Sequence, residues 1–81
     1  MATVHFPSSL RDLTGGAADV EVDAPTVRRL IAALDDRYPG MGERLAEGVS
    51  VSINGEILPD ALYEDIPDGA EIHFLPTLSG G

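Results

Sequence analysis

The stretch DAPTVRRLIAALDDRYPG, residues 23–40, decides the fold of this chain. Its apolar residues recur at intervals of three or four, the period of an amphipathic helix with one buried face. These apolar positions are Val27, Leu30, Ile31, Leu34 and Tyr38. Asp23 and Thr26 are residue types that cap a helix, and Pro25 is tolerated in a first turn. Pro39 and Gly40 end the periodic segment, so we expect one main helix here.

Short alternating segments precede this helix. Residues 4–6 and 20–22 each alternate apolar with polar side chains, which is typical of strands with one apolar face. Gly15 and Gly16 lie between them and indicate a turn. We therefore expect an antiparallel hairpin before the helix. After the helix, residues 41–47 are compatible with one more short helical turn.

The second half of the chain predicts further strands. Residues 49–53 alternate valine and isoleucine with serine, and Asn54-Gly55 follows, which is a strong signal for a hairpin. Residues 71–75 alternate again and form the expected last strand. Leu62 and Ile66 are expected to fill the core from the connecting loop. The order predicts an α+β domain with a mixed sheet of four to five strands wrapped on one main helix, the first and last strands lying parallel in the middle.

Composition limits the classes of function. The chain has 81 residues, the size of one domain, with 14 acidic residues against five basic ones and a net charge of −9. This charge argues against nucleic acid or an anionic membrane as a partner, and it favours a basic protein. All five basic residues are arginines, so no lysine is available for an isopeptide bond.

Several features of the sequence argue against an internal active site. With no cysteine, disulfides, thiolate zinc sites and cysteine nucleophiles are excluded. No triad spacing or phosphate loop is visible. His5 and His73 each fall between apolar strand residues and should point away from the core, so we expect no metal site. The start lacks a signal-peptide pattern and no apolar run could span a membrane, which predicts a cytoplasmic protein.

The carboxyl-terminal pair Gly80-Gly81 has no evident folding role, because glycines at a chain end fray. A tail without Cβ atoms can enter a narrow channel and bring its carboxylate to a nucleotide. The alternative is an inert end of no consequence. Residues alone leave both interpretations open.

The final stretch adds a resemblance to a known family. The residues concerned are Asp68-Gly69-Ala70-Glu71-Ile72, Leu75-Pro76 and Leu78-Ser79-Gly80-Gly81. In this order the chain resembles the ubiquitin-like sulfur carriers of the MoaD/ThiS type. Further pieces, which resemble the CysO-like carriers of cysteine biosynthesis, are Pro7, Leu10-Arg11, Thr14-Gly15-Gly16, Tyr38-Pro39-Gly40 and Glu43-Arg44-Leu45. The resemblance implies a ubiquitin-like β-grasp domain at residues 1–76 and a flexible tail at residues 77–81.

The same resemblance implies a chemistry for the tail. An ATP-dependent enzyme of the ubiquitin-activating type would adenylate the carboxylate of Gly81, and sulfur transfer would then give a thiocarboxylate. Gly80 and Ser79 would belong to the flexible tail. Partners would recognise Leu75, Pro76, Thr77 and Leu78. The chain itself would be a carrier and not an enzyme, and it would bind no cofactor, because ATP is used by the activating partner.

The resemblance also implies partners. The sulfur acceptor would be a cysteine-synthase-like enzyme, with a metal-dependent peptidase releasing cysteine, and the free carrier would be a monomer. Alternatives are the small subunit of molybdopterin synthase, which would bind a larger subunit, and a protein modifier conjugated through Gly81. A binding module with an inert tail is the remaining alternative.

Overall fold

A computed structural model of the chain describes residues 1–46, 49–58 and 62–76. In chain order, the elements are β1 (Ala2–His5), the 3₁₀ turn η1 (Ser8–Leu10), β2 (Asp19–Val22), α1 (Val27–Arg37), α2 (Met41–Ala46), β3 (Val49–Ile53), β4 (Glu56–Leu58) and β5 (Glu71–Pro76). The expected main helix and alternating strands are thus confirmed.

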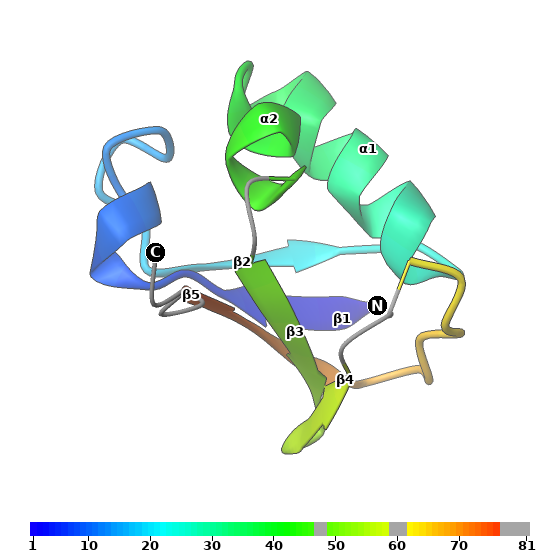
Figure 1. Cartoon of the computed structure of the whole chain (residues 1–81). Helices are drawn as coiled ribbons and strands as arrows, with labels where there is room; N and C mark the ends of the chain where they lie inside the picture. Colours follow the sequence, from blue (N-terminus) through cyan, green and yellow to red (C-terminus); the bar gives the residue numbers. More distant parts are fainter. Residues whose placement is uncertain (47–48, 59–61, 77–81) are drawn as a thin grey trace.

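The strands form one mixed sheet in the order β2-β1-β5-β3-β4 (Figure 1). β1 and β5 are parallel neighbours at its centre, with Thr3 opposite Glu71 and His5 opposite His73. The other neighbouring pairs are antiparallel. The predicted central pair of first and last strands is therefore confirmed, and it places the ends of β1 and β5 at the same edge of the sheet.

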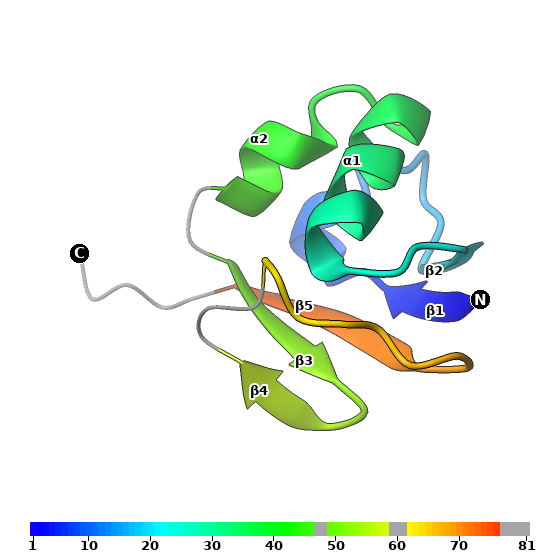
Figure 2. The ribbon, with the colours of Figure 1, turned by 90° about the vertical axis from the view of Figure 1, so that its right-hand side faces the viewer.

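The helices α1 and α2 lie over one face of the sheet, and in the described part of the chain no helix lies over the other face (Figure 2). α1 begins where Thr26, in extended conformation, accepts a hydrogen bond from the Arg29 amide through its side chain at 3.3 Å. This bond satisfies one of the amides that a helix start leaves without a partner. The amide of Gly42 in α2 similarly donates to Asp35 Oδ1 at 2.9 Å.

The core lies between the helices and the inner face of the sheet. Its members come from η1, from both helices and from the strands β1, β2, β3 and β5, and the largest fully buried ones are Phe74, Leu30, Leu34, Met41, Ile72, Val4 and Val27. Burying side chains of this size is the main source of stability for so small a domain.

The loop before β5 was predicted to place both Leu62 and Ile66 in the core, and only one of the two is there. Ile66 packs against the core as expected, but Leu62 is 50% exposed, so its predicted burial was wrong.

The hairpin between β3 and β4 follows its sequence signal. Asn54 and Gly55 both have positive φ, 51° and 87°, as a tight two-residue turn between twisted strands requires. The turn is also tied to the start of β5, because the Asn54 amide donates to the Glu71 carbonyl and the Glu71 amide donates to Asn54 Oδ1, both at 2.9 Å. The central strand is thereby held in register with this hairpin.

Candidate functional site

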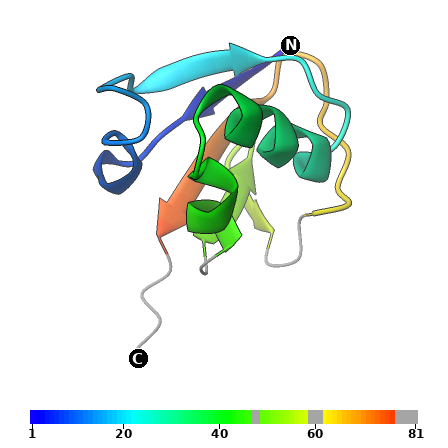
Figure 3. The ribbon, with the colours of Figure 1, turned by 90° about the horizontal axis from the view of Figure 1, so that it is seen from above.

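The candidate site begins where β5 ends. The end of β5 lies beside β3 (Figure 3). Leu75 and Pro76 pair with Ser50 and Val49 of β3, and Leu75 is 36% exposed. Pro76 is the last residue of β5, one residue beyond the predicted strand, and its missing N–H interrupts little of the ladder at this position. The other predicted site residues, Thr77, Leu78, Ser79, Gly80 and Gly81, lie outside the described residues.

The outer face of the sheet, which lies opposite the face that α1 and α2 cover, brings together two histidines that are far apart in the sequence. His5 in β1 and His73 in β5 are register partners, and their rings stack with centroids 4.5 Å apart and planes 15° from parallel. His5 Nε2 lies 3.2 Å from Glu71 Oε1. The prediction that both histidines point away from the core is confirmed, because the buried residues of these strands alternate with them.

The outer face also exposes one apolar residue that sequence reasoning did not select. Ile57 of β4 is 59% exposed and lies opposite Ser52, which in turn lies opposite His73. The alternation around Ile57 is too short to assign its face, since β4 has three residues. The pairing of Asn54-Gly55 could have revealed it, because that turn fixes the register of the following strand.

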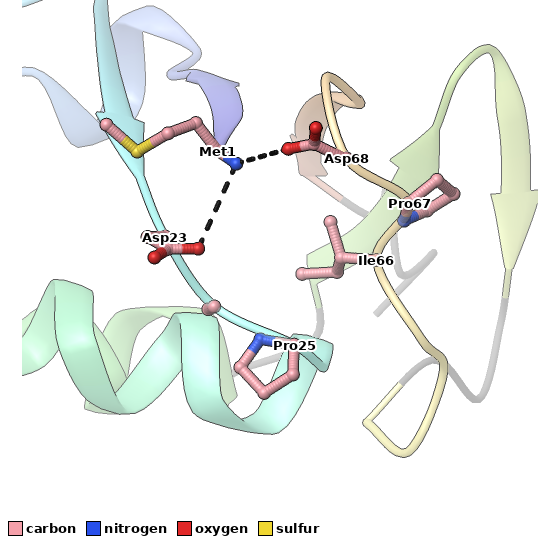
Figure 4. Close-up of a pocket in the computed structure, with 7 residues that line it drawn as sticks. Met1, Asp23, Pro25, Ile66, Pro67 and Asp68 are labelled. Carbon is pink, nitrogen blue, oxygen red and sulfur yellow. Dashed lines mark hydrogen bonds and ion pairs between the residues drawn. The ribbon is translucent and has the colours of Figure 1, made fainter.

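A small open pocket lies beside the start of β1, at the end of the sheet away from the end of β5 (Figure 4). Its volume is about 200 Å³, and it is lined by Met1, Asp23, Ala24, Pro25, Ile66, Pro67 and Asp68. The Met1 amine reaches Asp68 Oδ1 at 2.7 Å and Asp23 Oδ1 at 3.9 Å. Sites for small molecules typically measure roughly 300–1,000 Å³, so this pocket is small for such a role.

The ion pair in this pocket shifts the pKa values of both of its groups. The hydrogen bond from the Met1 amine lowers the pKa of Asp68, and the bond to Asp68 raises the pKa of the Met1 amine. Both side chains are largely exposed, so solvent screens the interaction and its stabilisation is small. The pair closes the start of β1 against the turn before β5 and shows no arrangement suited to catalysis.

The described residues also bear on metal sites and on membrane spans. In residues 1–46, 49–58 and 62–76, no group of three or more histidine, aspartate or glutamate side chains could hold a metal ion. No helix in this part of the chain is long and apolar enough to cross a membrane. The remaining candidates for a functional site are the outer face of the sheet and the end of β5.

Comparison with known proteins assigns the fold and the family. A mixed five-stranded sheet wrapped on one main helix, with parallel first and last strands at its centre, defines a ubiquitin-like β-grasp domain. The model of the ThiS family matches residues 4–81, so the chain belongs to this family. The match extends to the last glycine, Gly81.

Two curated relatives are named as sulfur carriers. The sulfur carrier protein CysO of Mycobacterium tuberculosis is 31% identical over 90 residues, covering 98% of this chain and 97% of the relative. The molybdopterin synthase sulfur carrier subunit of Pyrenophora tritici-repentis is 27% identical over 70 residues, covering 82% of this chain and 75% of that subunit. Both names describe sulfur carriers, which confirms the prediction that this chain is a carrier of this type rather than an enzyme.

A solved structure agrees with the fold. A chain in the crystal structure of the Amycolatopsis orientalis BexX/CysO complex superposes with a TM-score of 0.89 at 30% identity, and each chain covers 100% of the other. This similarity confirms the predicted β-grasp fold and the predicted resemblance to CysO-like carriers.

Proposed function

We propose that this chain is a sulfur carrier of cysteine biosynthesis whose reacting group is the carboxylate of Gly81. The observation that supports this most is the full-length similarity to CysO, together with a family match that includes the terminal Gly80-Gly81 pair. Because the reaction uses ATP, the proposal includes a cytoplasmic location.

The proposed reaction has two steps. A partner enzyme first joins the Gly81 carboxylate to AMP from ATP and releases pyrophosphate, because a bare carboxylate is a poor acyl donor. Sulfide then attacks the acyl carbon, AMP leaves, and the product is a thiocarboxylate. The carrier needs no thiol of its own for either step, which agrees with the absence of cysteine.

The proposal assigns different tasks to the end of β5 and to the tail. Leu75 and Pro76 end the folded strand, where Leu75 presents an exposed apolar side chain to an activating enzyme and to an acceptor. Thr77 and Leu78 would then be recognised along the channel that leads to the nucleotide, and Ser79 would belong to the flexible tail. Gly80 and Gly81 would pass its narrowest part, since they lack side chains.

The intact mass of the chain tests this proposal. After incubation with ATP, sulfide and the adenylating enzyme of its own host, we expect the mass gain of one oxygen replaced by one sulfur, located at Gly81. A chain lacking Gly80 and Gly81 should show no gain. A Leu62→Ala chain, altered at an exposed apolar residue before β5, should gain mass like the wild type. An unchanged wild-type mass with a demonstrably active enzyme would contradict the proposal.

A second candidate is the small subunit of molybdopterin synthase. Its support is the similarity to the sulfur carrier subunit from Pyrenophora tritici-repentis, which is lower in identity and in coverage than the similarity to CysO. The two candidates differ in the acceptor. A larger subunit that copurifies with the chain from its host and takes sulfur from it to make molybdopterin would favour the second. Sulfur transfer to a cysteine-synthase-like enzyme would favour the first.

A further inference from the structure

The chain carries few groups that could take an acyl group from its own Gly81. Amines and thiols readily attack an activated carboxyl group, and lysine and cysteine are the residues that bear them. The sequence contains neither residue, and its five positively charged side chains are all arginines. A guanidinium stays protonated near neutral pH, so it does not act as a nucleophile. The one amine that the chain itself could bring to Gly81 is therefore the α-amine of Met1.

The fold places the Met1 amine at the far end of the sheet from the last residue of β5 (Figure 3). β1 and β5 run parallel with Thr3 opposite Glu71, and the Gly69 amide donates to the Met1 carbonyl at 2.7 Å. Met1 therefore lies level with the turn before β5, whereas Pro76 lies at the other end of that strand. About seven residues of extended chain, each rising ~3.3 Å, separate the two levels, which is about 23 Å.

The segment after β5 is too short to bridge this distance. It consists of residues 77–81, and a segment of this length spans at most ~18 Å when fully extended. The direction of β5 widens the gap, because this strand runs away from Met1 and a return would use part of the available length in a turn. The carbonyl carbon of Gly81 therefore cannot meet the Met1 nitrogen of the same folded chain.

Two carboxylates beside Met1 also keep its amine protonated. The amine donates to Asp68 Oδ1 at 2.7 Å and lies 3.9 Å from Asp23 Oδ1. The hydrogen bond to Asp68 raises the pKa of the amine above its ordinary 8.0, which leaves less of the free base near neutral pH. An ammonium has no lone pair with which to attack, so the same contacts also limit attack on the activated Gly81 of a second copy.

We propose that the fold prevents the activated Gly81 acyl group from reacting with the chain's own amine, so that only a nucleophile from another molecule can take it. This inference rests on the proposed function and adds the class of nucleophile: sulfide, or an amine or thiol that a partner brings to Gly81.

The reaction that the fold prevents would close the chain into a ring. The Met1 nitrogen would attack the Gly81 carbonyl carbon, an amide bond would form, and the bond from this carbon to AMP would break. AMP would leave with the bonding electrons, and the nitrogen would lose its proton to solvent. A carrier closed in this way could no longer deliver sulfur.

A thioester at Gly81 tests this inference without a partner enzyme. The full chain is prepared with a small thiol joined to the Gly81 carbonyl, kept without sulfide at a mildly alkaline pH, and followed by intact mass. For the wild type we expect slow hydrolysis to the free acid and no internal amide. An internal amide would lower the mass by one molecule of the small thiol, because the thiol leaves as the C–N bond forms.

A matched pair of variants places an added cation within reach of Gly81. Ser50 of β3 is the register partner of Leu75, next to the end of β5. We expect Ser50→Lys to form the internal amide and to consume its thioester about tenfold faster than Ser50→Arg, because tethering raises the effective concentration of the amine. Ser50→Arg adds the same charge without a nucleophile. Equal rates would overturn the inference. If these variants fail to fold, Thr77→Lys and Thr77→Arg repeat the comparison after β5.

A longer segment after β5 tests the distance to Met1 directly. Eight glycine and serine residues inserted between Pro76 and Thr77 raise the maximal span to about 45 Å, which exceeds the distance to Met1. We expect this chain to form the head-to-tail amide, and Asp68→Asn to speed its formation severalfold, since the amine loses the charge that holds its proton. A wild-type chain that closes, or a lengthened chain that does not, would overturn the inference.

The thioester experiment can fail independently of the proposed function. Because the thioester replaces the adenylate, an overturned inference leaves open whether an activating enzyme loads Gly81 with sulfur. Conversely, an active enzyme that leaves the wild-type mass unchanged with ATP and sulfide overturns the proposed function, and the inference then loses the reaction on which it rests.

Discussion

The two faces of β5 show how one strand serves two purposes. On the inner face, Ile72 and Phe74 are buried against the helices, with exposed fractions of 0% and 1%. On the outer face, the neighbours Glu71 and Leu75 are exposed, and His73 stacks on His5. Burial that stabilises the fold and the side chains proposed for recognition are thus separated by a single step along the chain, because successive side chains of a strand point to opposite faces.

The largest effect is expected on the inner face. Phe74→Ala removes a ring that is stacked near Phe6 with centroids 6.5 Å apart and leaves a cavity in a small core. We expect a loss of about 3–5 kcal/mol in the free energy of unfolding, measured by urea titration. Because small domains have only about 5–15 kcal/mol in total, the variant should also melt well below the wild type.

A substitution at Leu75, the next residue, tests whether the two faces of β5 contribute differently to stability. Leu75→Ala truncates a partly exposed side chain on the outer face, so the same titration should show a loss of about 1 kcal/mol or less. Its effect should instead appear as a higher KM for adenylation. If Leu75→Ala and Phe74→Ala lose similar stability, the assignment of the two faces to separate purposes would be wrong.

The smallest effect concerns the pocket beside the start of β5. The pKa of Asp68 is lowered from its ordinary 3.8, so its contribution to stability is present above that value and is lost as the pH falls through the lowered one. The pKa of the Met1 amine is raised from 8.0, so its contribution is present below 8.0 and is lost as the pH rises through the raised value.

Asp68→Asn should therefore lower the melting temperature slightly near about pH 6 and have no effect in strong acid or well above the raised pKa of the amine. The measurement is a set of melting curves across this range, with Glu64→Gln as an exposed control before β5. A large loss near neutral pH would show that this ion pair stabilises the fold far more than its exposure allows.

Much of the fold could be predicted because its signals are local. The helix follows from apolar residues at a period of three to four, the strands from alternation, and the hairpin from Asn54-Gly55. The family could also be predicted from the end of the chain, because Leu75-Pro76 and Gly80-Gly81 occur there in the order typical of the family. Leu62 was assigned wrongly because an apolar residue in an irregular loop has no period that tells which way it points.

By itself, the sequence determined which segments are helical or extended and that one helix has a buried face. These properties depend on neighbours a few residues apart. Only the tertiary structure decided that His5 stacks on His73, that Ile57 lies on the same face, and that Met1 lies at the other end of β5 from Pro76. Such neighbours come from strands distant in sequence, and their pairing order and register are set by how the whole sheet packs against its helices.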